Sequence, residues 1–138
     1  MRYFVTPYVG IHTIEFGNTI SLVHNKIGEP LEQFYRGPDN TCLTDVYQDF
    51  FVYYKDRQYV EAIEFYGDIN VCVDEITIGD ETFDCVLKAF SQRDSEIILD
   101  EDGFTSKKYG IGVYCPSWRE SEELLVESII VFCEGYYD

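Results

Sequence analysis

The sequence predicts an α+β fold: an antiparallel sheet with two helices on one face, built from two tandem helix-plus-hairpin repeats. Three observations support this prediction. Two segments carry apolar residues at helical spacing behind a capping residue, and each is followed by a loop and two strand-like runs. These parts occur twice in the same order, so the repeats are expected over about 10–68 and about 71–135.

Both expected helices begin at a recognisable N-cap. The candidates are Asn18 or Thr19 for the first helix and Asp80 or Thr82 for the second. Gly28 ends the first helix, because glycine tolerates the left-handed conformation of a C-terminal cap. The apolar faces are Ile20, Val23 and Ile27 in the first helix and Phe83, Val86, Leu87 and Phe90 in the second.

The strand-like runs match between the two halves. The best match joins Val60–Tyr66 with Val126–Phe132, because both begin with Val-Glu, a small residue and Ile, and both precede a turn with glycine and an acid. A turn is expected at Lys55–Gln58 and a longer connection at 116–123. The remaining expected strands are Tyr3–Phe16, Val46–Tyr54, Val71–Ile78 and Gly110–Tyr114.

The length and composition fit one domain over residues 1–138. A chain of this size can bury about two-thirds of the surface that its unfolded form exposes. Hydrophobic residues make up 46% of the sequence, so a core of ordinary size is expected.

Charge is the strongest indicator of the partner class. The chain has 26 acidic and 10 basic residues, a net charge of −16, whereas solubility needs only about 2 to 8 units in a small domain. The acids are interleaved with apolar residues, which excludes a disordered acidic tail. Such a domain repels phosphates and anionic membranes and attracts basic partners. We therefore expect a basic macromolecule as partner, with no nucleic acid and no membrane.

The cysteines and the N-terminal residues predict a reduced, cytoplasmic protein. The five cysteines lack the C-x-x-C spacing of metal and redox sites. Four of them, Cys42, Cys72, Cys85 and Cys133, lie in or beside apolar runs, as small core residues do. The first residues show no apolar leader. No metal and no cofactor are expected.

No enzymatic motif stands out. His12 falls in an expected strand and His24 on an expected helix surface, and neither has a motif around it. The sequence contains no glycine-rich phosphate loop and no serine-centred nucleophile elbow. We expect no catalytic residues and no enzyme.

The first helix and its flanks resemble a known module. Ile14-Glu15-Phe16-Gly17-Asn18-Thr19, followed by Val23, Ile27-Gly28 and Pro30, resembles the opening of a helix-then-hairpin module. Such modules occur in beta-lactamase inhibitor protein, in small outer-membrane assembly lipoproteins and in immunity proteins of bacterial toxin systems. The second copy departs from the pattern, because it lacks the Gly-x-Pro ending and continues into Gln92-Arg93-Asp94.

The resemblance implies a binding protein. Without an apolar leader or a lipidated cysteine near the N-terminus, the chain most resembles an immunity protein of a contact-dependent or polymorphic toxin system. The implied function is to bind and block the active site of a cognate toxin domain, a basic nuclease, as a monomer that forms a 1:1 heterodimer.

Tyrosines mixed with carboxylates mark the expected contact surface. The sequence has 12 tyrosines, and each ring offers rigid contact area plus a hydroxyl. Strand alternation selects Tyr47, Asp49, Tyr53, Glu64 and Tyr66. A further acidic candidate is the expected loop tip Asp100, Glu101 and Asp102. The alternative for each residue is a tyrosine that covers the helices or an acid that is merely solvated.

Two other functions fit the composition. A DNA-mimic inhibitor of a DNA-binding protein would carry its carboxylates along a ridge, in imitation of the phosphates. A structural scaffold subunit would carry an apolar patch and self-associate. An immunity protein instead needs a local patch of acids and tyrosines on one face.

Overall fold

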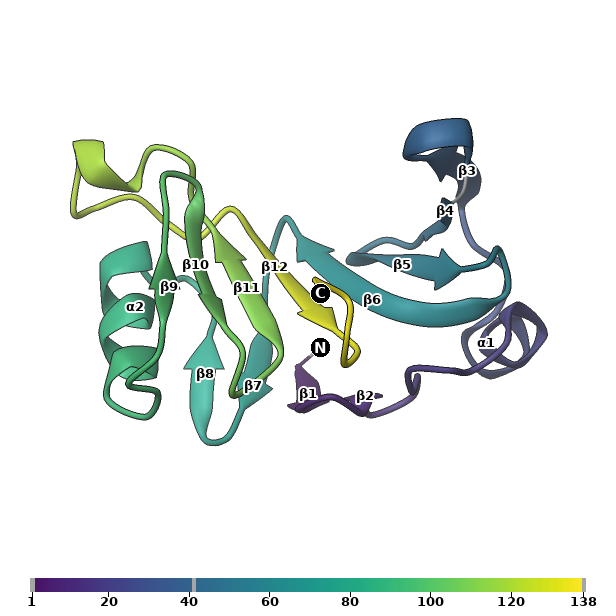
Figure 1. Cartoon of the computed structure of the whole chain (residues 1–138), viewed down its shortest axis with the longest axis horizontal. Helices are drawn as coiled ribbons and strands as arrows, with labels where there is room; N and C mark the ends of the chain where they lie inside the picture. Colours follow the sequence, from purple (N-terminus) through teal and green to yellow (C-terminus); the bar gives the residue numbers. More distant parts are fainter. Residues whose placement is uncertain (1, 41, 138) are drawn as a thin grey trace.

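The computed structural model describes residues 2–40 and 42–137 and has an α+β architecture with two helices and two sheets (Figure 1). The expected α+β class is thus confirmed. The larger sheet has eight strands, all antiparallel. In spatial order these are β3 (Glu32–Arg36), β4 (Cys42–Val46), β5 (Phe50–Lys55), β6 (Tyr59–Tyr66), β12 (Ser128–Phe132), β11 (Ile111–Tyr114), β10 (Gly103–Ser106) and β9 (Ile98–Leu99).

A second, four-stranded sheet corrects the expectation of a single antiparallel sheet. Its order is β2 (Gly10–Ile11), β1 (Tyr3–Thr6), β7 (Val71–Val73) and β8 (Ile76–Ile78). β1 and β7 run parallel, with Tyr3 opposite Val71. The opening segments of the two halves therefore pair with each other, a long-range contact that local patterns do not reveal.

Both helices begin where the sequence predicts. α1 (Ile20–Ile27) is capped by Thr19, whose side chain accepts a hydrogen bond from the backbone of Leu22, and it ends at Gly28 with φ of 87°. α2 (Phe83–Ser91) is capped in the same way by Thr82. A hydroxyl at the N-cap satisfies a backbone N–H that the helix leaves free. The two short 3₁₀ turns are η1 (Pro38–Asn40) and η2 (Trp118–Glu120).

The expected strand Val46–Tyr54 is divided in two. β4 ends at Val46, residues 47–49 form a turn, and β5 begins at Phe50. The backbone of Tyr47 donates to the carbonyl of Phe50, 2.9 Å away, which closes this hairpin. The alternation of side chains therefore restarts at Phe50 and does not run through from Val46.

The main core lies on one side of the large sheet. It contains Val23 of α1 and Val86 and Phe90 of α2, together with Ile63 of β6 and Ile129 of β12. Residues of the small sheet also belong to it. Figure 1 shows α1 and α2 at opposite ends of the molecule, with the small sheet between them. The helices and the small sheet together thus cover this side of the large sheet.

The junction between each helix and the large sheet has the same hydrogen bonds in both halves. Each helix-capping threonine forms an isolated bridge near the start of a central strand. Thr19 bridges to Tyr59, the first residue of β6, and Thr82 bridges to Leu125, three residues before β12. Backbone bonds flank each bridge, from Ile20 to Gln58 and from Val60 to Asn18 in the first half, and from Phe83 to Leu124 and from Val126 to Glu81 in the second.

A buried carboxyl ties α1 to the sheet. Asp45 of β4 has no exposed surface and accepts hydrogen bonds from Gln33 and Tyr54, each at 2.7 Å. His24 Nε2 also lies 2.7 Å from Asp45 Oδ2. The side chain of His24 is only 17% exposed, so the expectation of a helix-surface histidine is wrong. The network joins α1, β3, β4 and β5 around one residue.

All five cysteines have free thiols. Their burial differs from the expectation, because Cys115 is the buried one and Cys85 is exposed. Neither helix in residues 2–40 and 42–137 is long and apolar enough to cross a membrane.

Candidate protein-binding face

The side of the large sheet that faces away from the helices carries a second apolar cluster. Tyr53, Ala62, Ile130 and Phe132 form its centre, and no helix residue belongs to it. Because successive side chains of a strand alternate between the two faces, these residues point away from their neighbours in the main core. We call this side the open face; its side chains include Phe34, Arg36, Phe51, Tyr53, Glu64, Tyr66, Tyr114, Ser128, Ile130 and Phe132.

Glu64 is the carboxylate at the centre of the open face. It accepts hydrogen bonds from the hydroxyls of Tyr53 at 2.5 Å and Ser128 at 3.0 Å. Burial, together with the bond to Glu64, raises the pKa of Tyr53 far above its ordinary value. Tyr53 therefore stays a hydrogen-bond donor across the physiological range, and the Glu64 side chain is held in one position.

Arg36 adds a cation to this group. Its guanidinium carbon lies 3.7 Å from the centre of the Tyr53 ring, and its Nη2 atom donates to the Tyr136 hydroxyl at 3.2 Å. A guanidinium stacked on an aromatic ring is stabilised by the ring quadrupole. The centre of the open face thus presents one acid and one base, both fixed by tyrosines.

Three aromatic rings extend the face toward its β3 edge. Phe51 and Tyr66 stack with 4.5 Å between ring centres, and Phe34 meets Phe51 edge-on at 6.4 Å. The Tyr66 hydroxyl donates to the carbonyl of Tyr47, and burial raises the pKa of Tyr66. Phe34 remains 39% exposed.

The C-terminal segment lies over the other part of the face. Tyr136 and Tyr137 both pack on Phe132, with ring centres 5.9 and 4.9 Å away, and the hydroxyls of Tyr137 and Tyr114 lie 3.0 Å apart. A hollow of about 360 Å³ opens here, lined by Tyr8, Lys107, Phe132 and residues 134–137.

The structure brings together three of the residues expected to contact a partner. Tyr53, Glu64 and Tyr66 lie on the open face as neighbours. Tyr53 is itself buried, at 5% exposed, with Arg36 over its ring, so it supports this face from within. Asp49 lies in the turn before β5, where its carboxylate accepts from Tyr3 at 2.9 Å and its carbonyl accepts from the Tyr66 backbone at 3.3 Å. It therefore borders the face at Tyr66.

Tyr47 is placed elsewhere. It is 9% exposed, it belongs to the main core, and its hydroxyl donates to the carbonyl of Gly28 at 2.9 Å. The turn at 47–49 explains why Tyr47 does not share a face with Tyr53. Because the turn interrupts the strand, the alternation of side chains along β5 does not extend back to Tyr47.

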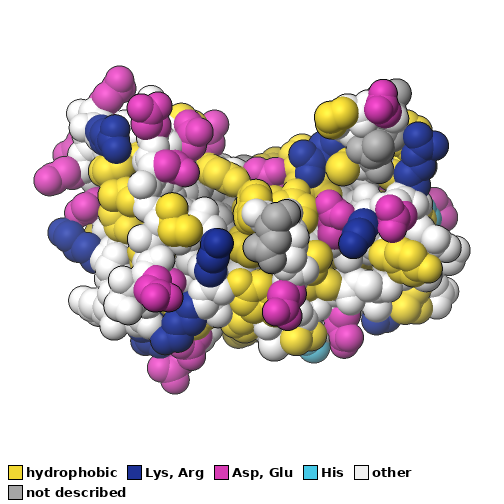
Figure 2. All heavy atoms as spheres, viewed as in Figure 1, with side chains coloured by type: hydrophobic (Ala, Val, Ile, Leu, Met, Phe, Trp, Pro, Cys, Tyr) yellow, Lys and Arg dark blue, Asp and Glu magenta, His cyan; other side chains and the backbone are white. Residues whose placement is uncertain are grey.

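Asp100, Glu101 and Asp102 form the turn between β9 and β10, at the far edge of the large sheet. Asp100 Oδ1 accepts the backbone N–H groups of Asp102 and Gly103, and its carbonyl accepts from Trp118 at 2.9 Å. η2 is thereby docked on this turn. Three further acids lie in or just after η2. We call the whole group the acidic corner; its members are Asp100, Glu101, Asp102, Glu120, Glu122 and Glu123. Figure 2 shows acidic side chains gathered over this end of the molecule, at the upper left.

Several open-face residues were missed by the sequence-based prediction. Arg36 and Phe34 belong to β3, a segment expected to be loop, and Tyr136 and Tyr137 follow the last expected strand. The adjacent pair Phe34 and Tyr35 was the available sign of a strand, since aromatic residues favour strands.

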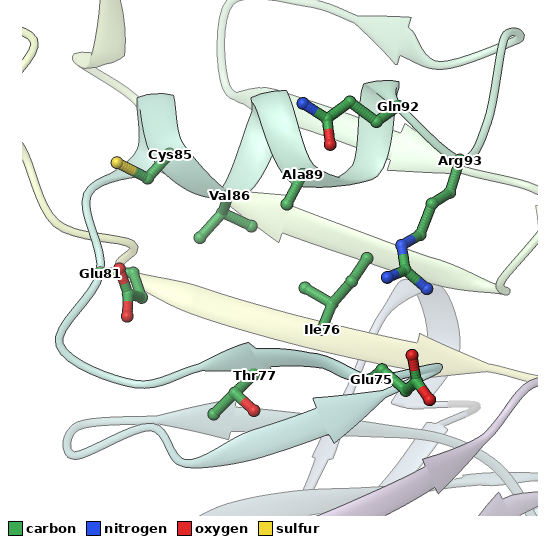
Figure 3. A pocket seen from close by; sticks show the side chains of 9 residues that line it. All are labelled: Glu75, Ile76, Thr77, Glu81, Cys85, Val86, Ala89, Gln92 and Arg93. Atoms are coloured by element: carbon green, nitrogen blue, oxygen red, sulfur yellow. The ribbon is translucent and has the colours of Figure 1, made fainter.

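A second hollow, of about 310 Å³, lies between α2 and the β7–β8 hairpin (Figure 3). Cys85 and Glu81 line one end of it, and Glu75 and Arg93 line the other. Arg93 is engaged with Asp74, donating to its carbonyl at 2.6 Å. None of the residues expected to contact a partner lines this hollow. Within the described residues, no three His, Cys, Asp or Glu side chains are placed to hold a metal ion.

Comparisons of the chain with protein-family models, with curated proteins and with solved structures found no match. The resemblance to inhibitor and immunity modules therefore stays a prediction.

Proposed function

We propose that this protein is an immunity protein that binds and blocks a cognate toxin domain, a basic nuclease, through the open face of its large sheet. The observation that carries the proposal is the aromatic cluster on that face, which surrounds the fixed Glu64 and Arg36 side chains. Aromatic and arginine residues dominate the energetically important centres of protein interfaces.

Preorganisation supports a tight complex. Tyr53 and Glu64 are bonded to each other before any partner arrives, and Arg36 is stacked on Tyr53. Binding then costs little additional side-chain entropy, because these groups do not have to be ordered at the moment of association.

The charge supports fast and selective association. A net charge of −16 attracts a basic domain at long range. The acidic corner and Asp49 lie near opposite edges of the large sheet, so a cationic partner is drawn toward both ends of the face. A nuclease cleft that attracts phosphates also accommodates carboxylates, for the same electrostatic reason.

We also infer that the chain consists of two tandem modules, about 10–68 and about 71–135. The matching hydrogen bonds of Thr19 and Thr82 to the sheet support this. The β6–β12 pairing supports it as well, because Ile63 lies opposite Val131 and Phe65 lies opposite Ile129. The sequence match aligns Ile63 with Ile129 and Phe65 with Val131. A twofold rotation that exchanges the two modules therefore turns the pair Ile63–Val131 into the pair Ile129–Phe65.

The test is co-expression of the chain with the toxin domain encoded beside its gene. We expect the wild type to restore growth and to bind the purified domain at 1:1 stoichiometry in calorimetry. Tyr66→Ala should weaken binding by about 10- to 100-fold, the range of an interface hot spot. Tyr59→Ala is the matched control, since Tyr59 is an exposed tyrosine beside the start of α1, and it should change binding by less than about twofold.

Two outcomes would contradict the proposal. One is growth inhibition that persists although the chain is expressed and folded. The other is an association rate that does not fall between about 50 and 500 mM salt, because electrostatic steering is screened at high salt.

The acidic corner favours a second function, a DNA-mimic inhibitor. Its six carboxylates lie on the turn between β9 and β10, at the end of η2 and in the residues just after η2. In that case the tightest partner would be a DNA-binding protein, DNA would compete for it, and Glu122→Gln with Glu123→Gln would weaken binding more than Tyr66→Ala.

A further inference from the structure

We propose that two copies of this chain associate through β3, the edge strand of the large sheet, in an antiparallel pair centred on Phe34. This inference rests on the edge strand alone and does not depend on the toxin partner. The two eight-stranded sheets would become one continuous sheet with a twofold axis at Phe34.

The two edges of the large sheet differ in how they are protected. β9 has only two residues, and Glu96 and the acids at 100–102 flank it. A second copy at this edge would meet like charges. Short edge strands and nearby charges are common protection against edge-to-edge pairing.

β3 is longer than β9, and the charges on it, Glu32 and Arg36, are of opposite sign. It has five residues, all paired with β4 in regular register, and it contains no lysine and no proline. The apolar side chains on and beside it are largely in solvent: Leu31, just before the strand, is 76% exposed, Tyr35 49% and Phe34 39%. An edge of this length and apolar character is a template for pairing with another chain.

The charges on β3 complement each other across the proposed axis. In an antiparallel pair centred on Phe34, Glu32 of one copy lies opposite Arg36 of the other, and the same contact occurs twice. Opposed side chains are then about 5 Å apart at Cβ, within reach of an ion pair. Phe34 lies opposite Phe34, and Gln33 lies opposite Tyr35.

Two prolines restrict the register. Pro30 and Pro38 lie at equal distances on either side of Phe34, and proline cannot donate to a strand ladder. A register centred on Gln33 places Glu32 opposite Phe34 and Arg36 opposite Pro30. A register centred on Tyr35 places Glu32 opposite Pro38. Among these registers, only the one centred on Phe34 pairs the opposite charges.

β3 is also held ready for pairing. Gln33 donates to the buried Asp45, and Arg36 is stacked on Tyr53 and bonded to Tyr136. To meet Glu32 of the second copy, the Arg36 guanidinium turns from Tyr53 toward the β3 edge, where it offers its N–H donors to the carboxylate. The backbone of β3 is already ordered by its pairing with β4, so little backbone entropy is lost on association.

The test measures self-association by sedimentation from about 1 to 500 µM, a range suited to weak interfaces. At about 0.15 M salt the Debye length is about 8 Å, which limits repulsion between the two acidic chains. We expect the wild type to form a dimer as concentration rises. Glu32→Arg alone and Arg36→Glu alone should each weaken the dimer by about tenfold or more, because each places two pairs of like charges across the axis.

An equimolar mixture of the two variants should restore the dimer, since each Arg then faces a Glu. Glu123→Arg is the control: it changes the net charge as Glu32→Arg does, but it lies outside β3 and should leave the dimer intact. Circular dichroism checks that Arg36→Glu is folded. If it is not, Glu32→Arg alone still tests the interface, because it leaves the contacts of Arg36 with Tyr53 and Tyr136 in place. A monomer at every concentration, which is the state expected from the sequence, would overturn the inference. So would a dimer that Glu32→Arg and Glu123→Arg affect equally.

Discussion

Replacement of Asp45 by alanine should lower the free energy of unfolding by about 3–5 kcal/mol. Tyr54 has no exposed surface, so its hydroxyl loses its acceptor without gaining water, at about 1–3 kcal/mol. His24 keeps part of its hydration and adds about 1 kcal/mol, and the void adds about 1 kcal/mol more. Gln33 is exposed and can turn to solvent at no cost.

Urea unfolding followed by circular dichroism measures this change. With a slope of about 2 kcal/mol per molar urea, the midpoint should fall by about 2 M. Asp49→Ala is the matched control, because Asp49 is only half-buried and its carboxylate accepts one hydrogen bond, from Tyr3. It should cost less than about 1 kcal/mol. An Asp45→Ala midpoint within about 0.3 M of the wild type would refute the reasoning that this residue holds α1 and β3 to the sheet.

Three further predictions concern caps and titrating groups. Thr19→Ala and Thr82→Ala should each cost about 1 kcal/mol in urea unfolding; a negligible effect of either one would show that its capping bond is not needed. Burial raises the pKa of Glu61, so the folded state holds the proton more tightly than the unfolded state and stability falls as pH rises through that pKa. Glu61→Gln should therefore raise stability at pH 7 and lose this gain below about pH 4, and a less stable variant at pH 7 would contradict the prediction. Burial and the bond to Asp49 raise the pKa of Tyr3 to about 12; since the unfolded value is about 10, its contribution is complete below about pH 10 and is lost as pH rises toward 12. Thermal unfolding at pH 9 and 11 should show this loss in the wild type and a smaller one in Tyr3→Phe.

The helices and the central strands could be predicted because their signals are local. Thr19 and Thr82 mark helix starts through a hydroxyl that bonds a backbone N–H three residues later. Gly28 marks a helix end through its positive φ. The best-matched strand runs, Val60–Tyr66 and Val126–Phe132, correspond closely to β6 and β12.

Part of the candidate site could also be predicted from the sequence. Tyr53, Glu64 and Tyr66 were expected to share a surface, and the pleat of β5 and β6 places them on the open face. Tyr47 was not correctly placed, because three residues of turn interrupt the strand that was expected to carry it. A period-two pattern does not show where a hairpin turns when its turn residues are themselves aromatic and polar.

The sequence by itself determined the net charge of −16, the fold class and the capped helices. These depend on composition and on contacts within a few residues along the chain. Only the tertiary structure decided the rest: the parallel pairing of β1 with β7, the burial of Asp45 beneath α1, and the position of Arg36 over Tyr53. Each of these contacts joins residues that are far apart in the sequence. Their proximity depends on the order in which the strands pair, and no local sequence pattern specifies that order.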